Sequence, residues 1–255
     1  MICMWNQYVD ISPSAVVQIV ALAHFFALFF GVSALRGLGK TVMLLALILK
    51  CKELDGGGRR QGPTLVVCPL SLVQQWAEEI ETKSSLSYIV FYGDQKPTSC
   101  DFGGADIVIT TYGTPQAELQ KKTRVNIDRS YGLLEHNWSR VILDEAHNVK
   151  NQSKLASKAC CMLKSTYRWV VTGTIIHNSL DDVFGLVKFL KHQPWSEPGF
   201  WKAAITTEMN RRDAPEANDG RAAEQTGMSV ALGRVRRLLL PIMIRRTKDS
   251  LSPDG

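Results

Sequence analysis

Short apolar runs, rich in β-branched residues, recur along the chain and are separated by longer amphipathic stretches. An unbroken apolar run of about four to eight residues is typical of a strand that is buried on both faces of a sheet. We therefore predict strands at residues 64–68, 86–92, 105–110, 140–143 and 168–172.

The segments between and after these runs carry apolar residues at helical spacing. The helix predicted at residues 72–83 contains Trp76, and Ser71 stands where an N-cap is expected. Further helices are predicted at residues 42–49, 149–163, 180–190 and 200–210. Strands that alternate with helices in this way predict an α/β fold with a mostly parallel sheet and helices on both faces.

Two regions fall outside this pattern. Residues 11–35 contain no charged side chain, and that length would span a bilayer. Against a membrane anchor, Gln18 and His24 interrupt the apolar run and no basic residue precedes it. Two other interpretations remain, a buried first strand and sequence that does not belong to the domain, and we favour a combination of these two. Residues 211–227 are polar and predict an exposed or disordered loop.

Length, charge and cysteine content narrow the class of protein. A chain of 255 residues suits one α/β domain with a single large core. The formal net charge of +6 favours a polyanionic partner, with a merely solvated basic surface as the alternative. The six cysteines lack Cys-x-x-Cys spacing, so they indicate neither a zinc site nor a disulfide framework, and a reducing compartment is the simpler assignment.

The predicted strand at residues 140–143 runs directly into two acids, Asp144 and Glu145. The carboxyl ends of parallel strands form the edge at which an open sheet binds ligands. An Asp at such a tip can bind Mg²⁺, directly or through water, and the following Glu can orient the water that attacks a γ-phosphate. The alternative is a strand that ends in a solvated acidic turn.

A second motif, far upstream, supplies the other half of a nucleotide site: Gly37-Leu38-Gly39-Lys40-Thr41. Its glycines let backbone N–H groups approach phosphate oxygens, while Lys40 offers charge to the β- and γ-phosphates and Thr41 a hydroxyl to the metal. The match to a phosphate-binding loop is partial, because Ala34 stands where the pattern expects its first glycine. Together, the two motifs indicate ATP and Mg²⁺ more strongly than either does alone.

With these motifs the chain resembles the Swi/Snf-type DNA-dependent ATPases of helicase superfamily 2. Within that family it most resembles the DNA-repair branch, which includes helicase-like transcription factor and the RING-bearing post-replication-repair translocases. The matching segments occur in the family's order, at residues 37–41, 65–76, 109–112, 138–147, 168–180, 188–195 and 245–249.

The resemblance implies a domain organisation. Residues 36–255 would form a helicase ATP-binding lobe, a three-layer RecA-like P-loop domain that is the first lobe of two, with a polar loop near 211–227. Residues 1–35 would be an atypical apolar segment outside the match, and the second helicase lobe would be absent. Since that lobe carries the family's arginine fingers, whose loss costs roughly a thousandfold or more in rate, we expect the chain to hydrolyse ATP slowly.

The resemblance also assigns chemical roles. Lys40, Asp144 and Glu145 would be the catalytic residues, and Thr41 and Asp144 would hold the magnesium ion. The residues that would bind ATP are Gly37, Leu38, Gly39, Lys40 and Thr41.

Residues that follow the strands would contact the phosphate backbone of double-stranded DNA through N–H and hydroxyl groups, which position without reading sequence. Structural alternatives remain, since Ser71 would otherwise cap its helix, Tyr112 would fill the core, and the Arg245-Arg246 pair would be a solvated face. The expected DNA contacts are Pro69, Leu70, Ser71, Thr110, Thr111 and Tyr112, and the residues expected to couple nucleotide to DNA are Thr172, Gly173 and Thr174.

The function implied by the resemblance is that of an ATP-dependent double-stranded-DNA translocase of the DNA-repair or chromatin-remodelling type. It would act in the nucleus, with chromatin or repair proteins as further partners and no membrane partner. Two alternatives from other classes are a catalytically silent DNA- or protein-binding fragment and, ranked lowest, a membrane-tethered nucleotide-binding protein.

Overall fold

A computed structural model describes residues 2–5, 40–54, 62–93, 102–124, 132–151, 153–176, 179–211 and 227–245, and for residues 2–5 it describes the backbone alone. The apolar segment 11–35, the loop glycines Gly37 and Gly39, and nearly all of the polar loop 211–227 lie outside these ranges. Predictions made for those segments therefore remain predictions.

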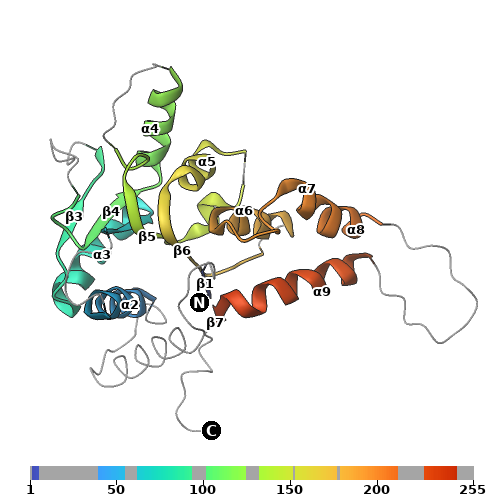
Figure 1. Cartoon of the computed structure of the whole chain (residues 1–255), viewed down its shortest axis with the longest axis horizontal. Helices are drawn as coiled ribbons and strands as arrows, with labels where there is room; N and C mark the ends of the chain where they lie inside the picture. Colours follow the sequence, from blue (N-terminus) through green and yellow to red (C-terminus); the bar gives the residue numbers. More distant parts are fainter. Residues whose placement is uncertain are drawn as a thin grey trace, which may run out of the picture.

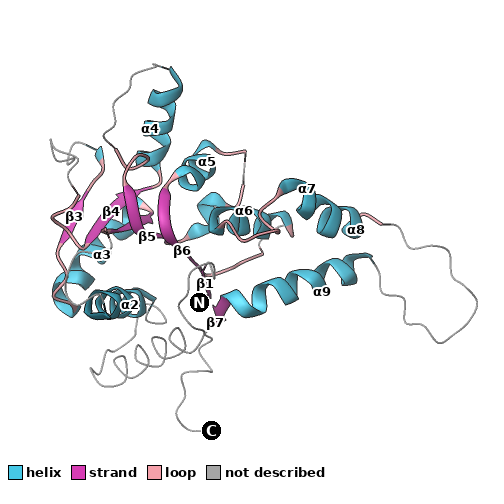
Figure 2. Cartoon of the chain, viewed as in Figure 1, coloured by secondary structure: helices cyan, strands magenta, loops and turns pink. Residues whose placement is uncertain are grey.

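Seven strands form one sheet at the centre of the molecule (Figure 2). Five of them are consecutive parallel neighbours, and β1 pairs antiparallel with the strands on both of its sides. The predicted parallel sheet is thus confirmed. In spatial order the strands are β3 (Tyr88–Val90), β4 (Ile107–Thr111), β2 (Thr64–Cys68), β5 (Asn137–Leu143), β6 (Lys164–Thr172), β1 (Ile2–Trp5) and β7 (Met243–Arg245).

Helices cover both faces of the sheet, as the alternation of elements predicts (Figure 1). On one face α2 (Lys40–Leu54) and α3 (Leu70–Lys83) pack against the strand side chains that include Val66 and Cys68. On the other face α4 (Gly113–Arg124), α5 (Leu155–Met162) and α6 (Asp181–Leu190) pack against the intervening strand residues. Because successive strand side chains point to opposite faces, each central strand contributes to both cores.

An arm of helices extends from the β6 side of the sheet (Figure 1). Three short elements, α7 (Pro198–Trp201), the π-helical η3 (Lys202–Thr206) and α8 (Thr207–Met209), run on as one helix, as predicted at residues 200–210. It packs against α9 (Gly227–Leu239), where the guanidinium of Arg234 donates to the carbonyl of Ala204 at 2.6 Å. After α9 the 3-10 turn η4 (Leu240–Ile242) leads into β7.

None of the helices within the described ranges has both the length and the hydrophobicity needed to cross a bilayer.

Two local predictions are wrong. The helix expected at residues 149–163 is shorter than predicted, because Val149 ends a 3-10 turn, η2 (Ala146–Val149), and α5 begins only at Leu155. Ser71 does not cap α3, because the helix begins at Leu70 and Pro69 takes the capping position without a side-chain hydrogen bond. Proline fits there because its fixed φ suits an extended residue that precedes the first turn.

A close approach between α6 and the backbone after η2 depends on Gly185. A Cβ atom at this position would lie 2.3 Å from the carbonyl oxygen of Lys150, so one of the two segments would have to move. We expect Gly185→Ala to lower the free energy of unfolding by about 1–3 kcal/mol, the range seen for overpacked cores.

The matched control is Gly233→Ala in α9, where an added Cβ would meet no atom within 4 Å. There alanine should raise the free energy of unfolding by about 0.4–1 kcal/mol, because it restricts the unfolded chain without strain. Urea unfolding of both variants measures the two effects, and equal shifts would contradict the packing argument.

Candidate active site

The acidic tip predicted after residues 140–143 lies at the carboxyl edge of the sheet. Asp144 extends the pairing of β5 with β2 by one residue, since its N–H donates to the carbonyl of Val67 at 2.9 Å. Glu145 then adopts a left-handed backbone with φ of 48°, which turns the chain abruptly into η2. This turn leaves two adjacent carboxylates at the end of a central strand, where parallel sheets bind ligands.

Both oxygens of the Asp144 carboxylate are fixed by hydrogen bonds. The indole Nε1 of Trp76 donates to Oδ2 at 3.0 Å, and the backbone N–H of Glu145 donates to Oδ1 at 2.9 Å. The phenol of Tyr112 donates to the backbone carbonyl of Asp144 at 2.8 Å. Trp76 belongs to the α2–α3 core and Tyr112 to the core on the opposite face, so Asp144 is held from both sides of the sheet.

Burial dominates the electrostatics of this carboxylate. It raises the pKa of Asp144, and the Trp76 hydrogen bond and the nearby charge of Lys40 oppose that rise. The pKa of the Tyr112 phenol is also raised, well above its ordinary value, chiefly by burial. Tyr112 therefore keeps the proton that it donates to the strand tip.

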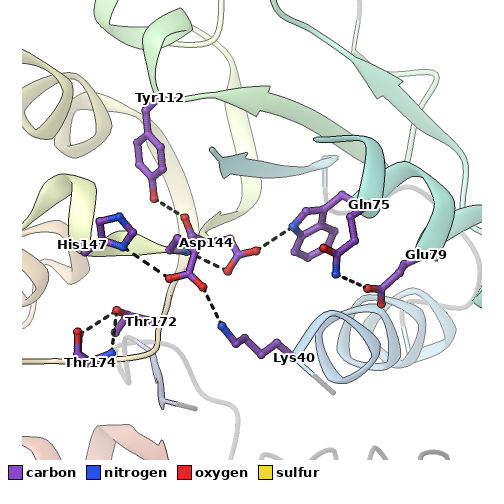
Figure 3. A network of polar contacts seen from close by, with 10 residues as sticks. Lys40, Gln75, Glu79, Tyr112, Asp144, His147, Thr172 and Thr174 are labelled. Atoms are coloured by element: carbon purple, nitrogen blue, oxygen red, sulfur yellow. Dashed lines mark hydrogen bonds and ion pairs between the residues drawn. The ribbon is translucent and has the colours of Figure 1, made fainter. Parts of the chain in front are cut away.

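Lys40, from the glycine-containing motif at residues 37–41, contacts the acidic residues at the end of β5 (Figure 3). Lys40 is the first residue of α2, and its Nζ lies 2.9 Å from Oε1 of Glu145, with both side chains about a quarter exposed. The imidazole of His147, which is more than half exposed, lies 3.6 Å from the other oxygen of Glu145. Residues that are far apart in the sequence thus place an ammonium and two carboxylates together at one edge of the sheet.

The donor set suits a magnesium ion. Thr41 lies in the first turn of α2 beside Lys40 and is almost fully buried, and Asp144 supplies carboxylate oxygens close to the same lysine. Hydroxyl and carboxylate oxygens are the ligands that Mg²⁺ prefers, and a lysine at this place would meet the phosphates that accompany it. The three remaining predicted ATP-binding residues, Gly37, Leu38 and Gly39, lie outside the described residues.

The predicted DNA contacts divide into an exposed and a buried group. Pro69, Leu70, Ser71 and Thr111 are at least partly exposed at the ends of β2 and β4, with Leu70 63% exposed.

The other two predicted DNA contacts are buried. The hydroxyl of Thr110 donates to the carbonyl of Phe91 at 2.6 Å, and that of Tyr112 is committed to Asp144. In this structure both hydroxyls are used inside the protein, and the expected DNA contacts of Thr110 and Tyr112 remain predictions.

The predicted coupling residues follow the end of β6. The Thr172 hydroxyl donates to the carbonyl of Thr174 at 2.9 Å and lies 3.4 Å from the N–H of the same residue, which closes a tight turn around Gly173 (Figure 3). Since β6 is the parallel neighbour of β5, this turn stands at the same edge of the sheet as Asp144. The geometry is compatible with a coupling role, which remains a prediction.

Sequence reasoning missed the partners of Asp144. The sequence places Trp76 on an amphipathic helix and at the end of the matching segment 65–76, and it gives Tyr112 as a DNA contact or a core residue. The available signal was weak: a tryptophan on the apolar face of a helix needs an acceptor for its N–H when it is buried.

A comparison with protein families decides how this arrangement is classified. Residues 36–254 match the family described as the SNF2-related domain. The chain belongs to the SNF2-related family. The resemblance to Swi/Snf-type ATPases drawn from the motifs is thereby confirmed.

Relatives and solved structures of SNF2-related proteins agree with this assignment. DNA repair protein rad5 of Neurospora crassa is 35% identical over 257 residues, which cover 86% of this chain and 20% of the relative. DNA repair protein rad8 of Schizosaccharomyces pombe is 32% identical over 241 residues, with 86% and 20% covered. The SNF2-related domain described here thus spans about a fifth of the length of these relatives.

Among solved structures, the Sulfolobus solfataricus SWI2/SNF2 ATPase core in complex with dsDNA is similar, with a TM-score of 0.63 and 25% identity. The match covers 95% of this chain and 46% of that core. The predicted α/β fold of a RecA-like ATPase lobe is therefore confirmed for the SNF2-related domain.

Proposed function

We propose that this SNF2-related domain is the ATP-binding lobe of an ATP-dependent double-stranded-DNA translocase of the DNA-repair or chromatin type. The observation that carries the proposal is the meeting of Lys40 with Glu145 at 2.9 Å beside the fixed carboxylate of Asp144. ATP hydrolysis requires an ammonium group for the phosphates, an acid for the metal and an acid for the attacking water. All three lie at the carboxyl edge of the sheet.

Each residue has a defined task in this proposal. Lys40 neutralises the β- and γ-phosphates, while Thr41 and Asp144 supply oxygen ligands to magnesium. Magnesium, when bound, neutralises charge that develops on the phosphates. Glu145 orients the attacking water, and its contact with Lys40 places that water close to the phosphate that the lysine holds.

DNA would lie along the same edge of the sheet. Leu70, Ser71 and Thr111 are candidates for hydrogen bonds to phosphate oxygens, through backbone N–H groups or through the hydroxyls of Ser71 and Thr111. Pro69 has no N–H or hydroxyl to donate, so any contact that it makes with DNA would be through its ring. The solved SWI2/SNF2 core in complex with dsDNA supports double-stranded DNA as the partner by similarity. We further propose a nuclear location, with repair or chromatin proteins as partners, because the relatives are DNA repair proteins.

Titration of the chain with Mg-ATP and with duplex DNA tests the proposal. We expect Mg-ATP binding that weakens when EDTA removes the metal, DNA affinity that is the same for unrelated sequences but changes with nucleotide, and slow turnover that DNA stimulates. The alternative function, a catalytically silent DNA- or protein-binding module, predicts the opposite: no Mg-ATP binding, and the same DNA affinity with and without nucleotide.

A further inference from the structure

Trp76, on α3, donates a hydrogen bond to Asp144 but has no role in the ATP chemistry proposed above. Trp76 is 2% exposed and lies on the buried face of α3 with Val73, Ala77 and Ile80. Its indole donates to Oδ2 of Asp144 at 3.0 Å, across 68 positions of sequence. A buried tryptophan could instead have satisfied its N–H with a backbone carbonyl, as Trp138 does with Leu133.

We propose that Trp76 is a positioning residue that holds the carboxylate of Asp144 in the orientation that binds the magnesium ion of Mg-ATP. This inference rests on the proposed function, in which Asp144 is a metal ligand. It extends that function by naming the residue outside the metal's own ligands that sets the geometry of one of them.

The hydrogen bonds around Asp144 leave room for a metal while they remove rotational freedom. A carboxylate has about four lone-pair sites, and the two donors, Trp76 and the N–H of Glu145, occupy one on each oxygen. An indole N–H can only donate, so Trp76 cannot compete for the cation. Groups that hydrogen-bond to a ligating carboxylate typically contribute about 10- to 100-fold to metal affinity.

The packing of α3 makes the indole a fixed donor. Val73, Ala77 and Ile80 anchor the helix to the sheet around Trp76, so the ring cannot follow a carboxylate that rotates away. The same helix begins at Leu70, among the candidate DNA contacts. A rigid helix therefore connects the edge that would bind DNA to the carboxylate that would bind the metal.

Trp76→Phe tests the proposal, because phenylalanine keeps a buried aromatic ring and removes the N–H. We expect this variant to bind Mn-ATP, a paramagnetic substitute for Mg-ATP, about 10- to 100-fold more weakly than the unmodified chain. Its affinity for metal-free ATP, measured by calorimetry in EDTA, should be unchanged. General damage to the fold would weaken both forms of ATP together.

Trp201→Phe is the matched control. Trp201 is also 2% exposed, and its Nε1 donates to a carboxylate, that of Asp181, at 3.3 Å. It lies in α7, on the opposite face of the sheet from Trp76. Its substitution removes the same chemical group from the core and should leave the affinity for Mn-ATP as it was.

Spectroscopic measurements on the unmodified chain and on Asp144→Asn test the hydrogen bond even if Trp76→Phe does not fold. The indole N–H signal of Trp76 in a nitrogen–proton correlation spectrum should broaden when Mn-ATP is added, and more strongly than that of Trp201, because Trp76 donates directly to Asp144. Asp144→Asn should displace the Trp76 signal, since it removes the charged acceptor.

The outcomes separate the two proposals. If the unmodified chain binds no Mn-ATP, the metal site fails and the positioning role fails with it. If the unmodified chain binds Mn-ATP and Trp76→Phe binds it equally well, the positioning role alone is overturned. The same holds if Asp144→Asn leaves the chemical shift of the Trp76 indole N–H unchanged.

Discussion

We expect Lys40→Ala to abolish DNA-stimulated ATP hydrolysis in a chimaera in which residues 36–255 replace the first lobe of a two-lobed SNF2-related ATPase core. The Nζ of Lys40 lies 2.9 Å from Glu145 at the strand edge, where it would meet the phosphates. Removal of one fixed donor to developing charge typically costs about 10²- to 10³-fold in turnover, so steady-state turnover with duplex DNA should fall to background.

Lys50→Ala is the control for that experiment. Lys50 lies in the same helix, α2, but pairs with Glu53 at 3.2 Å on the surface, and such exposed pairs contribute little to stability. Its substitution should leave turnover intact. Full activity of the Lys40→Ala chimaera would refute the assignment of the glycine motif.

The second large effect concerns the acid beside Asp144. We expect Glu145→Gln in the same chimaera to lower turnover by about 10²- to 10⁴-fold, the range for loss of a group that activates water. Affinity for Mg-ATP should be retained, because glutamine is nearly isosteric and the phosphate and metal ligands are unchanged. Single-turnover hydrolysis and equilibrium binding separate the two quantities.

Glu135→Gln provides a carboxylate of the same type outside the site. Glu135 pairs with Lys122 at 2.5 Å and Lys164 at 2.8 Å, and these two lysines lower the pKa of its carboxyl to about 2. Its loss should not affect turnover. Equal losses in the two variants would mean that Glu145 acts through general electrostatics and not on water.

The sequence was most informative where a short pattern determines local structure. The predicted strand at residues 64–68 has the same bounds as β2. Its five residues are all buried, and a strand that is buried on both faces appears in the sequence as a run without turn residues. The acidic tip at Asp144 and Glu145 was equally accessible, since an apolar strand that ends in two acids is a local pattern.

Long-range contacts could not be predicted in the same way. The bond between Trp76 and Asp144 depends on how α3 packs beside β5, which no spacing along the chain encodes. The bond between Tyr112 and Asp144 could not be predicted either, because the acceptor is a backbone carbonyl, which carries no sequence signal. The late start of α5 could not be predicted either, because the extended backbone of Lys154 directly before the helix has no signal in the sequence.

The pairing of β1 between β6 and β7 has a consequence for how the protein folds. Ile2 pairs with both Thr172 and Arg245, so β1 depends on two partners that lie far along the chain from it. Contacts between such distant residues form slowly, because a large loop must close first. We therefore expect the antiparallel pairing of β1 to form later in folding than the parallel pairing of β5 with β6, whose partners are closer along the chain.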